Sequence, residues 1–77
     1  MADVVFPGLS TDDPGAEGVV ATWFVDDGAT VAEGQLIAEV AVDKVDAEVV
    51  APSGGTIRII VGEGEAARQG SVIGTVG

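Results

Sequence analysis

The chain repeats one pattern of glycines and strand-forming residues at an interval of 36 positions. Each half contains a strand, an acidic glycine turn, a short connector, a glycine and a second strand. The matched pairs are Gly18 and Gly54, Val25 and Val61, Gly28 and Gly64, Gly34 and Gly70, Leu36 and Val72, Ile37 and Ile73, and Val40 and Val76. Self-similarity at a fixed spacing indicates a duplicated structural unit. We therefore expect two equivalent halves, related by a pseudo-two-fold axis.

The residue types indicate that both halves are built from strands. Hydrophobic residues make up 47% of the 77 positions, but the only aromatic ones are Phe6, Trp23 and Phe24. Valine and isoleucine dominate instead, and their stiff χ1 angles favour strands over helices. The expected strands cover about 3–6, 18–25, 35–42, 45–51, 56–61 and 71–76, with one or two short strands between them. We predict a single all-β domain over residues 1–77, a sandwich or flattened barrel.

Alternation of apolar and polar residues assigns faces to the two central strands. In the first of them, one face is expected to carry Leu36, Ala38, Val40 and Val42, and the other Ile37, Glu39, Ala41 and Asp43. In the second, the face with Val45, Ala47, Val49 and Ala51 alternates with Asp46, Glu48 and Val50.

Charge and composition exclude several functions. Thirteen acidic residues against three basic ones give a net charge of −10, which repels nucleic acids and anionic membranes. The chain has no histidine and no cysteine, so the usual general bases, thiol nucleophiles and soft metal ligands are missing. No metal site and no catalysis by the domain alone are expected. If chemistry occurs here, we expect an imported reactive group to perform it.

Lys44 is the one lysine of the chain, and it stands between two strand-like runs. The segment Val42-Asp43-Lys44-Val45 predicts a tight hairpin with Asp43 and Lys44 at its central positions. Because no glycine is available there, we expect a type I turn rather than a primed one. Lys44 would then stand on a protruding tip, with Val42 and Val45 anchoring the base of the turn. Trp23, Arg58 and Arg68 are expected to have structural or surface roles.

The segment "AVDKVDAEVVAPSGG" resembles the lysine-bearing hairpin of lipoyl domains. The segments "PGLS", "EGVVATWFVDDGATVAEGQLIAEV" and "GTIRIIVGEGEAARQGSVIGTVG" follow the rest of that family pattern, so the resemblance covers nearly the whole chain. It implies a flattened barrel of two four-stranded antiparallel sheets. Lys44 would lie on a turn of one sheet, and both termini would lie in the other.

The resemblance also implies a carrier function. Lipoate would be attached to Lys44 by a lipoate-protein ligase or lipoyltransferase, with Asp43 and Val45 as flanking recognition residues. The partners would be a thiamine-diphosphate-dependent 2-oxo acid decarboxylase, an acyltransferase core and dihydrolipoyl dehydrogenase. The family's decarboxylase-selecting loop implies a recognition role for Leu9, Ser10, Thr11, Asp12 and Asp13. We expect a monomeric domain, either excised from a multidomain acyltransferase or free-standing.

The chain departs from the family pattern near the lysine. Ala41 and Val42 replace the frequent Glu-Thr or Glu-Ser, Val45 replaces the commoner alanine, and the segment from Gly8 to Ala16 is slightly longer. The N-terminal residues show no signal peptide. We therefore expect the domain in the cytoplasm of a bacterium or archaeon, or in the mitochondrial matrix of a eukaryote.

Two other functions remain open. A biotinyl carrier shares the architecture, but that family flanks its lysine with methionines, and the one methionine here is Met1. An unmodified structural barrel would leave Lys44 without a role.

Overall fold

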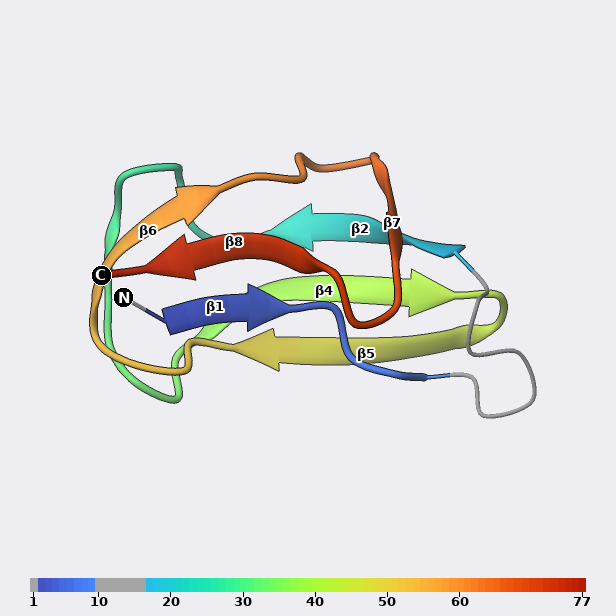
Figure 1. Ribbon diagram of the computed structural model, residues 1–77, viewed down its shortest axis with the longest axis horizontal. Coiled ribbons are helices and arrows are strands. Elements are labelled where there is room, and N and C mark those ends of the chain that lie inside the picture. Colours follow the sequence, from blue (N-terminus) through green and yellow to red (C-terminus); the bar gives the residue numbers. More distant parts are fainter. Residues whose placement is uncertain (1, 10–16) are drawn as a thin grey trace.

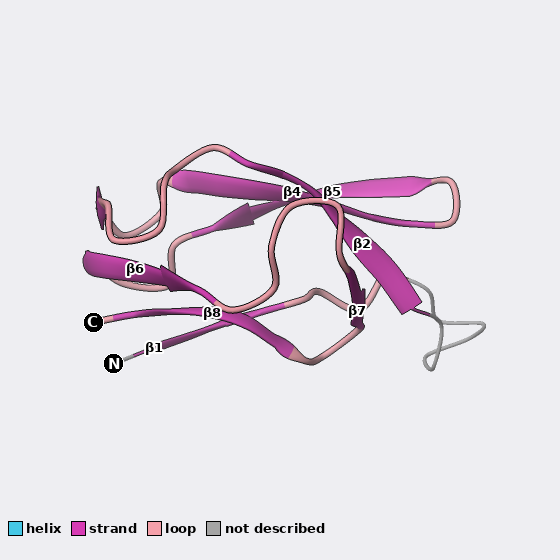
Figure 2. Cartoon of the chain, turned by 90° about the horizontal axis from the view of Figure 1, so that it is seen from above, coloured by secondary structure: helices cyan, strands magenta, loops and turns pink. Residues whose placement is uncertain are grey.

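The computed structural model describes residues 2–9 and 17–77 as two layers of strands (Figures 1 and 2). The strands are β1 (Ala2–Val5), β2 (Glu17–Trp23), β3 (Thr30–Val31), β4 (Leu36–Val42), β5 (Val45–Val50), β6 (Gly55–Ile59), β7 (Ala66–Arg68) and β8 (Val72–Val76). The six predicted long strands are confirmed to within two residues at each end, and β3 and β7 are the expected short ones. In this part of the chain, no helix is long and apolar enough to cross a membrane.

Each layer is an antiparallel sheet of four strands. One sheet has the order β1-β8-β6-β3 and the other β5-β4-β2-β7. The two orders match strand for strand, with β1 equivalent to β5, β8 to β4, β6 to β2 and β3 to β7. The predicted duplication is therefore confirmed as two equivalent sheets. The protein measures 35 × 19 × 16 Å along its principal axes, which agrees with a flattened barrel.

Glycines at repeated positions have repeated backbone conformations. Gly28 and Gly64 have φ angles of 89° and 82°, and Gly34 and Gly70 have φ angles of 82° and 84°. These values lie in the left-handed region, which glycine enters without a Cβ penalty. The same glycine pattern in both halves therefore builds the same pair of turns twice.

The core lies between the two sheets and consists of aliphatic side chains with one aromatic ring. Four large residues, Phe6, Ile37, Ile57 and Ile73, are fully buried, and each contributes about 1.5–3 kcal/mol of hydrophobic stabilisation. The buried core residues are Val4, Phe6, Val20, Val31, Ile37, Ala38, Val40, Val42, Val49, Ala51, Ile57, Ala67, Ile73 and Val76. Trp23 packs against this core and donates its indole Nε1–H to the Val61 carbonyl oxygen at 2.9 Å, which confirms its structural role.

One predicted face assignment in β4 is wrong. Ala38, Val40 and Val42 share one face as expected, and this face points into the core. Leu36, expected on the same face, is 37% exposed, and Ile37, expected on the opposite face, is fully buried. The pairing of β4 with β5 shifts register between Leu36 and Ala38. A bulge adds one residue to the strand and so reverses the alternation on one side of it.

The turn between β4 and β5 also differs from its prediction. Asp43 has a φ angle of 55°, whereas both central residues of a type I turn have negative φ. A positive φ at the first central position is a property of the primed turns, whose twist matches that of the flanking strands. Aspartate is one of the few residues other than glycine that tolerate this conformation.

Gly18 of β2 lies at a tightly packed position beside β4 and the Phe6 ring. A Cβ atom at this position would collide with the Ala41 carbonyl oxygen and would lie 2.5 Å from Phe6 Cζ and 2.7 Å from Val42 Cγ2. At the equivalent position in the other half, a Cβ on Gly54 would meet no atom closer than the Val31 carbonyl oxygen at 3.5 Å. The duplicated glycines therefore have different packing roles.

We expect Gly18→Ala to lower the free energy of unfolding by about 2 kcal/mol, because overpacking forces the backbone apart. Gly54→Ala should change it by less than about 0.5 kcal/mol, since the added methyl group has room and also restricts the unfolded chain. Urea denaturation of both variants measures the difference. An equal loss of unfolding free energy in both variants would show that Gly18 is not packed more tightly than Gly54.

Asp43→Val should lower the free energy of unfolding by about 1–2 kcal/mol, because a β-branched residue resists the left-handed conformation. Asp43→Gly should stay within about 0.5 kcal/mol of the parent. Lys44→Val is the matched control, because Lys44 has no positive φ. A similar loss from valine at both positions in urea denaturation would contradict the assignment of a primed turn.

Candidate functional site

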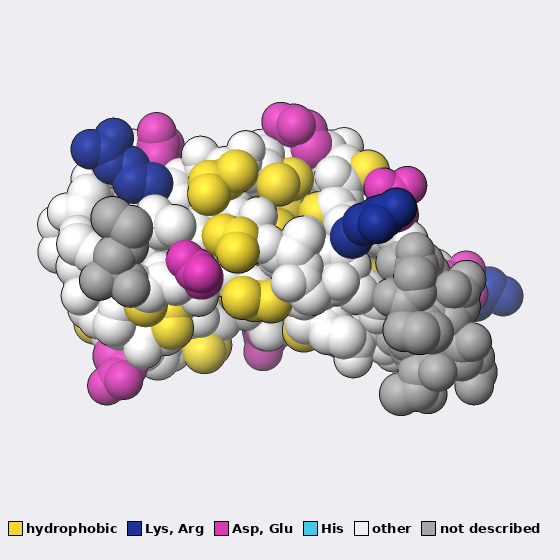
Figure 3. Space-filling view, in the orientation of Figure 1, with side chains coloured by type: hydrophobic (Ala, Val, Ile, Leu, Met, Phe, Trp, Pro, Cys, Tyr) yellow, Lys and Arg dark blue, Asp and Glu magenta, His cyan; other side chains and the backbone are white. Residues whose placement is uncertain are grey.

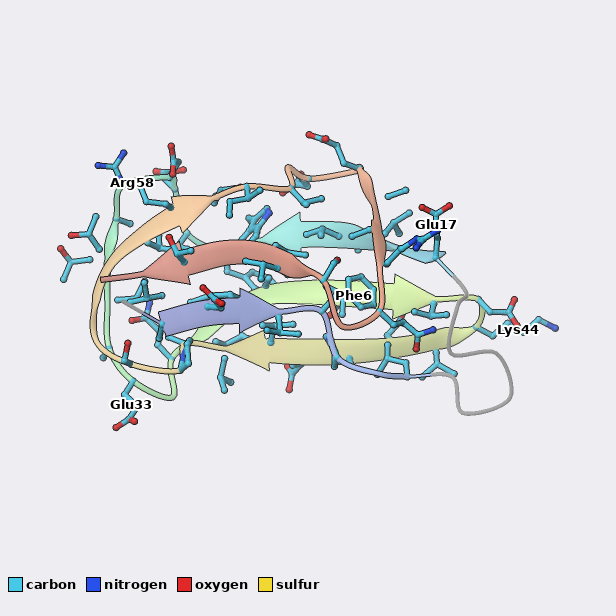
Figure 4. The ribbon with its side chains drawn as sticks, in the orientation of Figure 1. Phe6, Glu17, Glu33, Lys44 and Arg58 are labelled. Carbon is cyan, nitrogen blue, oxygen red and sulfur yellow. The ribbon has the colours of Figure 1, made fainter. Side chains whose placement is uncertain are left out.

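The β4–β5 hairpin extends beyond the body of the protein at one end of its long axis. Val42 and Val45 form its last strand pair, with Asp43 and Lys44 between them. Figure 4 shows the Lys44 side chain pointing away from both sheets. Lys44 is exposed, and among residues 2–9 and 17–77 its amine makes no hydrogen bond or ion pair. The predicted protruding lysine is confirmed.

The base of the hairpin is asymmetric. Val42 is 3% exposed and packs into the core, whereas Val45 is 49% exposed. Both residues were expected to anchor the turn, but only Val42 does so. Its burial also gives a physical reason for one departure from the family pattern, because an apolar side chain here extends the core to the foot of the turn.

The support beneath the hairpin comes from Phe6 and Gly18. The Phe6 ring is fully buried and reaches the position where a Gly18 side chain would stand, next to Val42. The Phe6 N–H donates to the Ser71 carbonyl oxygen at 2.9 Å, and the Phe6 carbonyl oxygen accepts from the Gly70 N–H at 2.8 Å. The hairpin therefore stands on a packed and hydrogen-bonded base.

The predicted recognition loop is described only at its first residue. Leu9 packs against the core, and its N–H donates to Gln69 Oε1 at 2.6 Å. The remaining predicted recognition residues, Ser10, Thr11, Asp12 and Asp13, lie outside the described residues. Asp43 and Val45, the predicted flanking residues, are both exposed beside Lys44.

Acidic residues next to the hairpin were not among the predicted site residues. Asp46 and Glu48 lie on the outer side of β5, and Glu39 lies opposite Glu48 on β4. Their period-two spacing after Lys44 was visible in the sequence and could have indicated a charged outer face. In the described part of the chain there is no enclosed pocket and no group of three or more potential metal ligands.

Comparisons with known proteins agree with this geometry. The Biotin_lipoyl family model, described as "Biotin-requiring enzyme", matches residues 4–76. The dihydrolipoyllysine-residue succinyltransferase component of the 2-oxoglutarate dehydrogenase complex of Bacillus subtilis (strain 168) is 30% identical over 77 residues. This match covers 99% of the chain but 18% of that relative.

A solved structure gives the same result for the fold. The solution structure of the lipoyl domain of the 2-oxoglutarate dehydrogenase complex from Azotobacter vinelandii superimposes with a TM-score of 0.79 at 32% identity. The match covers 100% of this chain and 96% of that one. The chain therefore belongs to the biotin- and lipoyl-attachment family, as a domain of the lipoyl type.

Proposed function

We propose that Lys44 carries lipoate in amide linkage and that the domain acts as an acyl carrier. The observation that supports this most directly is the position of the one lysine, exposed at the tip of a supported hairpin. The site fits the group, because an unencumbered amine is what amide formation with the lipoate carboxyl requires. When bound, lipoate supplies a dithiolane that takes up an acyl group together with two electrons.

The residues of the domain present this arm and keep it in reach of other enzymes. The lysine stem and lipoyl chain together extend about 14 Å, estimated from ordinary bond lengths. The arm can therefore enter an active-site channel while the domain stays outside it. A hairpin held by Val42 fixes the attachment point, so the partner meets Lys44 in one place. The chain contains no cysteine that would exchange with the dithiol.

We infer the partners from the two relatives. Both are named for the 2-oxoglutarate dehydrogenase complex, and the Bacillus protein is a succinyltransferase component. The arm would then take a succinyl group from a thiamine-diphosphate-dependent decarboxylase and deliver it to coenzyme A at an acyltransferase core. Dihydrolipoyl dehydrogenase would reoxidise the dithiol. Because the chain spans 18% of the Bacillus relative, we propose that it is one domain of a longer acyltransferase component.

Biotin is the second candidate cofactor, because the matching family model is described by it. Two observations favour lipoate. Asp43 and Val45 flank the lysine where biotinyl domains have methionine, and the Azotobacter structure is a lipoyl domain.

The intact mass of the protein tests the carrier function. After incubation with lipoate, ATP and a lipoate-protein ligase, we expect a gain equal to one lipoyl amide. Lys44→Arg should show no gain, because arginine keeps the charge but offers no acylatable amine. Incubation with biotin and a biotin-protein ligase should leave the mass unchanged.

A second lipoyl domain in the same reaction serves as a positive control for the ligase. If that domain is modified and the wild-type chain is not, the carrier function is wrong. A mass gain with biotin alone would replace the cofactor and leave Lys44 as the attachment site.

A further inference from the structure

The duplication places an equivalent row of exposed apolar side chains on the outer face of each sheet. Direct strand pairs join Val50 to Leu36 in one row and Val5 to Val72 in the other. The third members, Phe24 and Ile60, donate their N–H groups to the Ile37 and Ile73 carbonyl oxygens at 2.8 and 2.9 Å. All six side chains are 37–59% exposed. Figure 3 shows the face opposite the lysine-bearing sheet, where hydrophobic side chains gather over β6 and β8.

The charges beside these two rows are not equivalent. On the lysine-bearing sheet, Glu48 pairs with Glu39, whose other neighbour is Thr22. On the opposite sheet, the equivalent positions hold Asp3 paired with Thr75, whose other neighbour is Arg58. The first face therefore carries two carboxylates and no cation in this row, whereas the second balances one carboxylate with one guanidinium. Asp46, paired with Ala41, adds a further carboxylate towards the hairpin.

The three carboxylates of the lysine-bearing face differ from other carboxylates of the domain, which accept hydrogen bonds from backbone N–H groups. Asp27 accepts the Ile59 N–H, Glu63 the Trp23 N–H and Glu65 the Gly62 N–H. Within the described residues, Glu39, Asp46 and Glu48 accept no such bond. Like charges directly opposite each other on neighbouring strands are destabilising. The Glu39–Glu48 pair therefore works against stability, which points to a role in binding.

The acidic row connects the apolar row to Lys44. With a rise of about 3.3 Å per residue, Asp46, Glu48 and Val50 lie about 7, 13 and 20 Å along β5 from Lys44. A standard interface buries about 800 Å² on each partner, a patch about 30 Å across. One protein can therefore cover the apolar row and the acidic row and still receive the arm in its active site.

We propose that the outer face of β5, β4 and β2 is a docking surface for the decarboxylase that acylates the arm. The complementary surface would place lysine or arginine side chains around an exposed apolar side chain. This inference rests on the carrier function proposed above. Charge complementarity calls for a partner with a basic surface, because an acidic face on a chain of net charge −10 repels a second copy of itself. The position of this face beside Lys44 calls for a partner that receives the arm.

The duplication provides matched controls for a test of this surface. Glu48→Lys and Asp3→Lys make the same kind of charge change at equivalent positions, and Val50→Ser and Val5→Ser make the same apolar change. Each lipoylated variant is titrated as substrate of a 2-oxoglutarate-decarboxylating enzyme, and kcat and KM are determined. We expect Glu48→Lys to raise KM about tenfold and Val50→Ser about threefold, with kcat unchanged, and the controls to stay within about twofold.

Three readouts distinguish an effect on docking from an effect on folding or on the carrier function. Glu48→Lys removes a like-charge pair, so the Tm of this variant should rise. Weaker binding by a variant with a higher Tm cannot be explained by loss of structure. Acylation of the wild type reports on the carrier function. Binding of unlipoylated wild type, Glu48→Lys and Asp3→Lys domains to the same enzyme, measured at low and high salt, reports on the surface by itself.

Three outcomes would overturn the proposal. Equal effects of Glu48→Lys and Asp3→Lys would show a general charge effect rather than a docking face. KM values unchanged in every variant, together with unchanged binding of the unlipoylated domains, would place recognition elsewhere. A domain dimer in sedimentation velocity, dissociated by Glu48→Lys, would assign the face to a second copy of the chain.

Discussion

Contact between Phe6 and the backbone at Gly18 closes the gap between the two sheets at the end that carries Lys44. Phe6 follows β1 of one sheet, and its ring reaches β2 of the other. A residue with any side chain at Gly18 would push these layers apart. The hairpin depends on this contact, because Val42 at its foot packs against the same point.

The equivalent residue in the other half shows how the duplication has diverged. Ala51 donates its N–H to the Gln35 carbonyl oxygen and accepts the Gly34 N–H, each at 2.8 Å, as Phe6 does with Ser71 and Gly70. The backbone arrangement is thus repeated, while the side chain is large in one half and small in the other. The two halves thus share these backbone hydrogen bonds, but only the half beneath Lys44 has a large aromatic side chain, Phe6, at this position.

Much of this arrangement could be predicted from the residues. The spacing of the glycines predicted the duplication, and β-branched runs predicted the strands, because both depend on local backbone preferences. The exposed position of Lys44 followed from two strands separated by two residues. The inward position of Ile37 could not be predicted, because the bulge arises from pairing with β5. The turn at Asp43 was misjudged because strand twist, rather than the lack of glycine, decides its shape.

β1 begins and β8 ends at the pole of the barrel opposite the lysine hairpin (Figure 1). A chain joined to either strand would therefore hold the domain at one pole while Lys44 works at the other. The barrel then acts as a rigid lever, whose 35 Å length adds to the arm of about 14 Å. The reactive end of such an arm could sweep a radius of about 50 Å around its tether. Because the sheets are stiff, the length of the domain adds to the distance that the lipoyl arm can cover between successive active sites.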